Sequence, residues 1–222
     1  MNVVIFGATG MIGQGLLREC LLDPRIKLVQ VVGRTPVGVQ HAKLKELLVT
    51  DLYDYSAVET QLSGFDACFF CLGVSVSGKT EAQYTRITYD LTMAAAQTLC
   101  RRNPEMRFFY ISGASTDSTE HGKVMWARVK GKTENALLAL PFKDAYMFRP
   151  GAIEPMHGEV SKTPAYRWFY LLAKPLLSPL RALFPRYVTS TEELARAMIN
   201  VAQRGHTQAI VHSAEIAGLA TS

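Results

Sequence analysis

Short apolar runs alternate along the chain with longer segments whose apolar residues recur at helical spacing. The runs Val3–Phe6, Leu28–Val32 and Ala67–Gly73 are nearly continuous, which predicts strands buried on both faces of a sheet. Between the first two runs, Met11–Leu22 has the period of an amphipathic helix. Strands and helices in this alternation are typical of a parallel sheet with helices on each side. The pattern therefore predicts a doubly wound α/β fold with a mainly parallel sheet.

Further strands and helices follow from the same pattern. Strands are predicted at Leu44–Thr50, Arg107–Ser112 and Asp144–Gly151, and helices at about 81–102 and 123–140. Together with the elements above, they extend the alternation of strand and helix through the first two thirds of the chain.

The C-terminal third has a different composition. Residues 155–188 are rich in proline, tyrosine, phenylalanine and leucine, and the following STEELARAMINVAQ segment predicts a helix. Ser190 and Glu193 stand three residues apart at its start, as in a capping box. We expect residues 1–154 to form the doubly wound domain, and residues 155–222 to form a small helical lobe packed on it within one structural domain.

Composition and charge narrow the class of protein. The chain has 222 residues, of which 48% are hydrophobic, enough for one globular domain with a full core. Its net charge of +5 fits a phosphate-bearing ligand but is too small to indicate nucleic-acid binding. The 4 cysteines do not resemble a disulfide framework, and the 5 histidines lack the spacing of metal ligands. We therefore expect a reduced, cytoplasmic protein without a bound metal.

One apolar stretch raises the question of membrane binding. Residues 166–185 contain Arg167, Lys174, Arg181 and internal prolines, so they lack the roughly 20 uninterrupted apolar residues that a bilayer span needs. A buried helical cap is the preferred interpretation, and a membrane-surface or partner-facing hairpin is the weaker one. The N-terminus has no basic region before its short apolar run and does not resemble a signal peptide.

The sequence GATGMIG separates the first predicted strand from the first predicted helix. Gly7 allows a tight turn, Gly10 lets a pyrophosphate approach the backbone, and Gly13 lets the helix pack closely on the strand. Amide groups at the start of the helix would then face the phosphates. This context predicts a dinucleotide site, with a glycine-rich turn that binds nothing as the alternative.

The end of the second predicted strand indicates which dinucleotide binds. An NAD enzyme usually places Asp or Glu there, roughly 20 residues after the glycines, to bind the ribose hydroxyls. This chain has Gly33 and Arg34, and a guanidinium can pair with the 2′-phosphate of NADP. We therefore favour NADP over NAD, with an exposed surface charge as the alternative for Arg34. Asp51, after the third predicted strand, could bind the adenine amino group or cap a turn.

The ordered segments GATGMIG, VVGR, TDL, FFCLG, YISGAST, VKGKTE and FRPG resemble the atypical short-chain dehydrogenase/reductases. Within that class the chain is most similar to the HIV-Tat-interactive-protein-like oxidoreductases and the epimerase/dehydratase-like proteins. The resemblance is strong over roughly residues 1–155 and loose beyond them. It implies a cofactor site made of Gly7, Thr9, Gly10, Met11, Ile12 and Gly13 at the pyrophosphate, Arg34 at the 2′-phosphate, Asp51 and Leu52 at the adenine, Cys71, Leu72 and Gly73 on the ribose–nicotinamide side, and Pro150 and Gly151 in a cofactor-side turn.

The same resemblance implies the catalytic side chains. A serine at the end of the fifth strand polarises the substrate carbonyl, and both Ser112 and Ser115 are placed for that role. Lys130 matches the lysine that holds the nicotinamide ribose. Four residues earlier, on the same helix face, the family has a tyrosine that exchanges a proton with the substrate. This chain has Trp126 there, and an indole does not ionise usefully. Trp126 could stack on the nicotinamide or on an aromatic substrate, or be a core residue.

Three functions remain open at this point. An NADPH-dependent oxidoreductase would transfer a hydride to a small carbonyl acceptor, with a proton from a serine-bound water or from Tyr84, Tyr89 or Tyr166. A non-catalytic NADP(H)-binding protein with a redox-sensing or regulatory role is the alternative that Trp126 favours. A nucleotide-sugar epimerase or dehydratase is weaker, because the short C-terminal lobe leaves little room for a large substrate. Neither the substrate nor the oligomeric state follows from the sequence.

Overall fold

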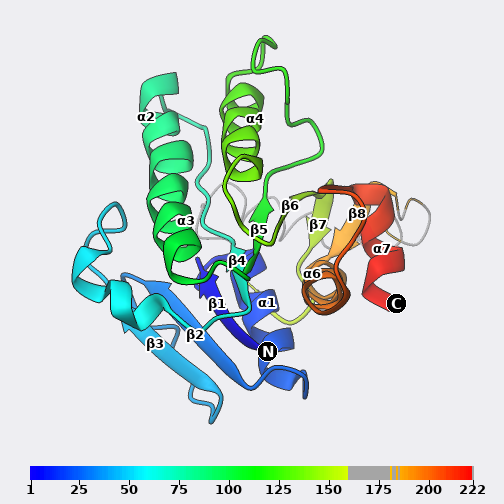
Figure 1. Cartoon of the computed structure of the whole chain (residues 1–222). Helices are drawn as coiled ribbons and strands as arrows, with labels where there is room; N and C mark the ends of the chain where they lie inside the picture. Colours follow the sequence, from blue (N-terminus) through cyan, green and yellow to red (C-terminus); the bar gives the residue numbers. More distant parts are fainter. Residues whose placement is uncertain (160–180, 182–183, 185, 222) are drawn as a thin grey trace.

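A parallel sheet forms the centre of the computed structural model, which describes residues 1–159, 181, 184 and 186–221 (Figure 1). Its strand order is β3-β2-β1-β4-β5-β6-β9, and every neighbouring pair is parallel. The strands are β1 (Asn2–Phe6), β2 (Leu28–Gly33), β3 (Leu44–Leu48), β4 (Ala67–Phe70), β5 (Arg107–Ile111), β6 (Asp144–Arg149) and β9 (Ile210–His212). The chain first adds strands on one side of β1 and then on the other. The predicted doubly wound fold is therefore confirmed.

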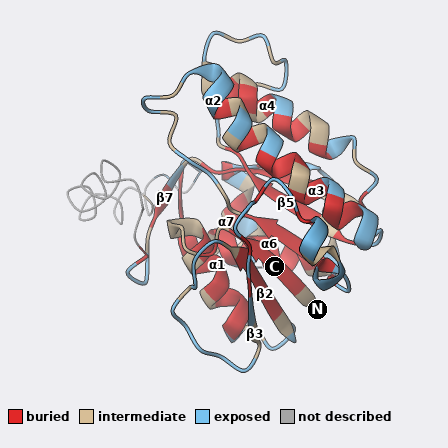
Figure 2. Cartoon of the chain, turned by 90° about the vertical axis from the view of Figure 1, so that its left-hand side faces the viewer, coloured by how far each residue is buried: buried red, intermediate tan, exposed pale blue. Residues whose placement is uncertain are grey.

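Helices cover both faces of this sheet. One layer contains α1 (Met11–Leu22), α6 (Thr191–Arg204) and α7 (Ser213–Thr221), and the other contains α3 (Leu91–Arg102) and α4 (Met125–Leu138). The side chains of β1 alternate between the two faces of the sheet. Val3 and Ile5 pack against the first helix layer, and Val4 and Phe6 pack against the second. Figure 2 shows the result, with buried strands between helices whose outer faces are exposed. Burial on both faces is why these strands are continuously apolar.

The predicted elements form, with differences at their ends. The first helix has the predicted bounds, and the helix predicted at 81–102 forms as three consecutive segments, α2 (Glu81–Thr85), a π-helical turn η2 (Arg86–Asp90) and α3. The strand predicted at 67–73 ends at Phe70, because Cys71 and the residues after it leave the sheet at its carboxyl edge. A 3-10 helix, η1 (Ser56–Leu62), was not predicted.

The C-terminal region contributes to the main sheet. The capping box is confirmed at the start of α6, where Ser190 Oγ accepts from Glu193 N–H at 3.0 Å and the Glu193 carboxylate accepts from Ser190 N–H at 2.9 Å. The sequence pattern missed β9 and α7, and also a separate pair of short strands, β7 (Ala152–Glu154) and β8 (Val188–Ser190).

Two expectations about this region stay predictions. The division of the chain after residue 154 is one of them. The other concerns the apolar stretch 166–185, which lies outside the described residues except for Arg181 and Phe184; Tyr166 lies outside them too. Within the described part of the chain, no helix is both long enough and apolar enough to cross a membrane.

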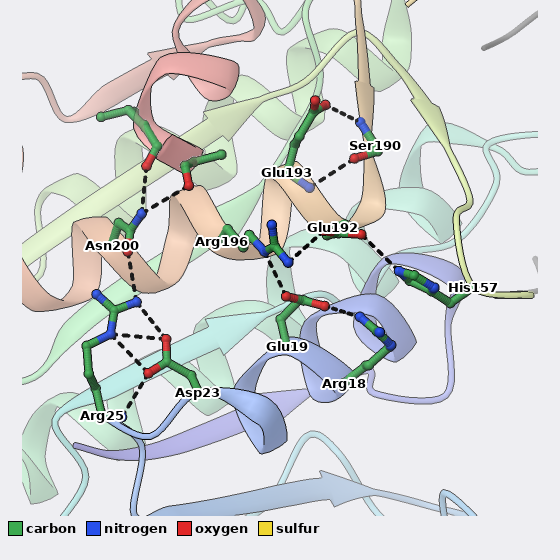
Figure 3. Close-up of polar contacts among 12 residues, drawn as sticks. Arg18, Glu19, Asp23, Arg25, His157, Ser190, Glu192, Glu193, Arg196 and Asn200 are labelled. Carbon is green, nitrogen blue, oxygen red and sulfur yellow. Dashed lines mark hydrogen bonds and ion pairs between the residues drawn. The ribbon is translucent and has the colours of Figure 1, made fainter. Parts of the chain in front are cut away.

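A network of charged side chains joins α1 to α6 (Figure 3). Arg196 lies 3.0 Å from the Glu19 carboxylate and 2.7 Å from that of Glu192, and Arg18 also contacts Glu19. The His157 ring lies 2.9 Å from Glu192, and this hydrogen bond lowers the pKa of the Glu192 carboxyl. Glu19, His157 and Glu192 have ligand-type atoms within 4.8 Å of one another, but the two arginines already neutralise the carboxylates. The cluster is therefore an ion-pair network that fixes α6 on α1.

Candidate functional site

The glycine turn lies where the strand order of the sheet reverses. The chain leaves β1 through Gly7, whose φ of 80° is in the region that favours glycine. A Cβ on Gly7 would lie 2.7 Å from the backbone nitrogen of Leu72, so the turn contacts the segment that follows β4. A Cβ on Gly13 would lie 2.1 Å from the Gly7 carbonyl oxygen, so α1 begins directly against the turn. These contacts leave no room for a side chain at either position. They agree with the tight turn predicted at Gly7 and the close helix packing predicted at Gly13.

The start of α1 lies at the same edge of the sheet and suits an anion. Its N-cap is Gly10, which has no side chain to cap the helix, and the Gly10 N–H is bonded to the Gly7 carbonyl at 2.9 Å. The amides of Met11, Ile12 and Gly13 belong to the first turn, where a helix has no internal acceptors for its N–H groups. The helix dipole adds a partial positive charge there. These residues therefore fit a pyrophosphate.

Two predicted cofactor residues follow neighbouring strands on the β2–β3 side of the turn. Arg34 comes directly after β2, is exposed, and forms no ion pair within the described residues. Asp51 follows β3, and its carboxylate accepts the N–H of Tyr53 at 2.8 Å. Leu52, which follows Asp51 in the chain, has a buried side chain. Of the two interpretations of Asp51, the structure shows the turn cap, and the adenine contact stays a prediction.

The segment Cys71–Gly73 lies on the other side of the turn, after β4. Cys68 packs in the sheet layer of α3, whereas Cys71 packs against the layer of α1, so the two cysteines point to opposite faces as predicted. All 4 cysteines are free. Burial raises the pKa of the Cys71 thiol to about 12, so this thiol is not a nucleophile near neutral pH. Contact of this segment with a cofactor stays a prediction.

The end of β5 meets α4 through Ser112 and Lys130. The ammonium of Lys130 donates to the backbone carbonyl oxygen of Ser112, and the hydroxyl of Ser112 donates to the Glu134 carboxylate. A hydroxyl has one proton, so this bond leaves Ser112 none to offer a substrate. Ser112 is 7% exposed, whereas Ser115 is exposed at the edge of the sheet. Sequence spacing did not distinguish the two serines; the structure gives them different surroundings, and which of them faces a substrate stays a prediction.

A buried ion pair lies beneath these residues, and the sequence analysis missed it. Glu134 is 0% exposed and is held by Arg149 at the end of β6, with Arg149 Nε 3.1 Å from Glu134 Oε1 and Arg149 Nη2 bonded to Oε2. Arg149 also donates to Ser118 Oγ at 2.5 Å. One signal was available, because Glu134 stands four residues after Lys130 and therefore shares its helix face. Arg149 comes from a distant strand, and no local spacing pairs it with Glu134.

The loop between β5 and α4 packs closely on that helix. A Cβ on Gly131 would lie 1.7 Å from the carbonyl oxygen of Asp117, so only glycine fits there. Trp126 is half-buried, and a Cβ on Gly113 would lie 3.7 Å from its ring. The indole therefore lies against the residue that follows Ser112, at the edge of the site, and is not a core residue. Thr116, in the same turn, is buried, and its hydroxyl has no hydrogen-bond partner in the described part of the chain.

The predicted turn after β6 completes this edge. The Pro150 carbonyl accepts the N–H of Ala114 at 3.0 Å, which joins it to the loop after Ser112. A Cβ on Gly151 would lie 2.2 Å from the carbonyl oxygen of Tyr187, so Gly151 is required by packing against the segment before β8. The carboxyl ends of the parallel strands thus bring the predicted residues to one edge of the sheet, where ligands of this fold bind. Which of them contact a cofactor stays a prediction.

Comparison with known proteins agrees with this architecture. Residues 2–95 match the family model of the NAD-binding domain of semialdehyde dehydrogenases. Among solved structures, the Bordetella bronchiseptica enzyme WbmF in complex with NAD+ has a TM-score of 0.70 at 17% identity, covering 99% of this chain and 76% of that one. The UDP-glucuronic acid 4-epimerase of Bacillus cereus in complex with NAD has a TM-score of 0.67 at 15% identity, covering 96% and 76%. The chain therefore has a Rossmann-like α/β fold, and its predicted resemblance to short-chain dehydrogenase/reductase and epimerase-like proteins is confirmed at the level of the fold.

Curated relatives correct one expectation. "Protein fmp52, mitochondrial" of Emericella nidulans is 25% identical over 76% of this chain and 74% of its own length. "Protein FMP52, mitochondrial" of Debaryomyces hansenii is 24% identical over 94% and 90%. The expected cytoplasmic location is contradicted by these names. It rested on the absence of a disulfide framework, and reduced cysteines do not identify a compartment.

Proposed function

We propose that this chain is an NADP(H)-dependent oxidoreductase that transfers a hydride to a small carbonyl compound. The observation that supports the choice of NADP is Arg34, an exposed guanidinium that lacks an ion pair among the described residues and follows β2. An NAD enzyme usually has a carboxylate at this position. A planar guanidinium binds a phosphate through two parallel hydrogen bonds. A single ribose hydroxyl cannot accept both of these bonds.

The residues of the site fit the rest of such a cofactor. The uncapped start of α1 would hold the pyrophosphate, and Cys71–Gly73 would line the ribose–nicotinamide side. When bound, a reduced nicotinamide supplies a hydride. At the other end of the edge, the exposed hydroxyl of Ser115 would orient the carbonyl oxygen of the substrate, because the hydroxyl of Ser112 is bonded to Glu134. The relatives' names support a mitochondrial setting for this activity.

The first test measures nucleotide preference by thermal unfolding. Saturating NADPH should raise the melting temperature more than NADH does, and Arg34→Ala should remove the difference. A tenfold preference for NADPH corresponds to about 1.4 kcal/mol, which is resolvable in a domain of this size.

Arg102→Ala is the matched control for this test. Arg102 is also exposed, but it lies at the carboxyl end of α3, remote from the carboxyl edge of the sheet. This variant should keep the preference of the wild type. Equal stabilisation of the wild type by both nucleotides would refute the assignment to NADP.

A second candidate function has one observation in its favour. Trp126 occupies the position of the usual proton-exchanging tyrosine, which suits a protein that binds NADP(H) to sense redox state and catalyses nothing. Nucleotide binding together with no NADPH oxidation, followed at 340 nm across a panel of aliphatic and aromatic aldehydes and ketones, would favour this second function.

A further inference from the structure

Among the residues that the structure describes, the Lys130 ammonium forms no ion pair with a carboxylate. Lys130 is half-buried, and its Nζ donates to the neutral carbonyl oxygen of Ser112. Glu134 lies one helical turn away, but its oxygens are already bonded to Arg149 and Ser112. Within the described residues, no carboxylate lies at ion-pair distance from Nζ. A buried cation with one neutral acceptor releases a proton more readily than one in an ion pair.

Electrostatics agree with this geometry. Burial lowers the pKa of Lys130 to about 8, and the negative charge of Glu134 opposes the shift only in part. Near neutral pH the amine is therefore mainly protonated and is still acidic enough to give its proton to a developing alkoxide.

The other groups near this part of α4 are poor proton donors. Trp126 does not ionise, and Ser112 is bonded to Glu134. Burial raises the pKa of Tyr110, and Tyr84 is itself buried. Nearer the surface, Tyr89 of η2 lies under the Lys132 ammonium at 4.7 Å, and Glu81 of α2 pairs with Arg128 at 2.7 Å.

We propose that Lys130 is the proton donor of this enzyme, in place of the tyrosine that Trp126 replaces. The proposal rests on the proposed function. As a hydride from the reduced nicotinamide adds to the carbonyl carbon, the π bond of the carbonyl breaks and its oxygen takes a proton from Nζ. The products are an alcohol, the oxidised dinucleotide and a neutral amine. The amine then takes a proton from water, so that one hydride and one proton are consumed in each turnover.

The direct test needs no substrate. The nucleotide-free protein is trace-labelled with acetic anhydride from pH 6 to 11, and the labelled fraction of each lysine is measured by mass spectrometry of its peptides. Lys130 should be labelled with a midpoint near pH 8. Lys123, which is exposed and lies two residues before the start of α4, serves as the internal reference for a solvent-exposed lysine. An ordinary midpoint for Lys130 would overturn the proposal.

The second test separates a proton donor from a residue that only holds the ribose. Lys130→Arg keeps the positive charge but cannot release a proton near neutral pH. This variant should bind NADPH within about threefold of the wild type and reduce the carbonyl panel at least about 100-fold more slowly. Wild-type turnover should fall as pH rises through 8, because the donor must be protonated. Lys123→Arg is the matched control and should behave as the wild type does.

The outcomes distinguish this proposal from the function on which it rests. If the wild type binds neither NADPH nor NADH, the proposed function fails. If the wild type binds NADPH and reduces a carbonyl, and Lys130→Arg does so at a similar rate, the proposed function stands and Lys130 is not the donor. Binding without any turnover by the wild type overturns the Lys130 proposal and supports the sensing function.

Discussion

The two ends of the candidate site are built in different ways. The glycine-turn end, Gly7–Gly13, is made of backbone, and its shape depends on glycines whose missing side chains leave room for close contacts. The serine–lysine end consists of Ser112, Lys130, Glu134 and Arg149, and its shape depends on side chains bonded to one another. The first end can bind an anion with the amides of a helix start. For the second, we propose that Lys130 holds and releases a proton.

Because the two ends are built differently, they should respond differently to amino-acid substitutions. At the glycine-turn end, an added methyl group meets backbone atoms that cannot move aside. At the serine–lysine end, loss of one partner leaves a buried charge without its counter-ion. We therefore expect steric sensitivity at one end and electrostatic sensitivity at the other.

The largest expected effect is at the buried ion pair. Glu134→Ala should lower the free energy of unfolding by about 3–5 kcal/mol, because it leaves the Arg149 guanidinium buried and unpaired. Urea denaturation measures this. The control is Glu105→Ala, which removes an exposed pair with Lys143 and should cost less than about 1 kcal/mol. The double variant Glu134→Leu/Arg149→Met should recover much of the loss. A double variant as unstable as Glu134→Ala would contradict the electrostatic account.

A smaller loss of stability is expected at the glycine-turn end. Gly13→Ala would place a methyl carbon 2.1 Å from the Gly7 carbonyl oxygen, and we expect it to cost about 2–3 kcal/mol and to abolish nucleotide binding. Gly10→Ala is the matched control. The nearest atom to its added methyl, the same carbonyl oxygen, lies at 3.4 Å, so this variant should fold nearly normally. Similar losses in the two variants would show that crowding at Gly13 is not the cause.

Lys130→Met, in contrast, should raise the free energy of unfolding. The folded-state pKa of Lys130 is about 8, below its unfolded value, so keeping the ammonium protonated costs stability below pH 8. The variant should therefore be about 1–2 kcal/mol more stable than the wild type at pH 7. The wild type gains stability as pH rises from 8 towards 10.5, and the difference should shrink over that range. Chemical denaturation at pH 7 and pH 9.5 measures it; a difference independent of pH would contradict the burial of the charge.

The smallest effect is expected at Asp51. Asp51→Ala removes the acceptor for the Tyr53 N–H and should cost about 0.5–1 kcal/mol, whereas Asp51→Asn keeps an oxygen there and should cost less. If Asp51 only caps this turn, both variants should bind NADPH as the wild type does. A tenfold loss of affinity in Asp51→Asn would instead indicate contact with the adenine.

The sequence predicted the structure best where a local pattern had a local cause. Continuous apolar strands, the glycine turn and the capping box at Ser190 and Glu193 all formed as predicted. It missed β9, whose three residues are too few to show a period. It also missed the partner of Glu134, because Arg149 is 15 residues away and pairs with it only after β6 has joined the sheet beside β5.

The sequence by itself determined the fold and the glycine turn, because strand burial and glycine geometry are properties of residues close together in the chain. It could not choose between Ser112 and Ser115, and it could not show how Lys130 is held. Only the tertiary structure decided the contacts of these side chains: the Ser112 hydroxyl is bonded to Glu134, and the same carboxylate is paired with Arg149. The physical reason is that the charge and proton affinity of a buried group depend on which distant groups fold against it.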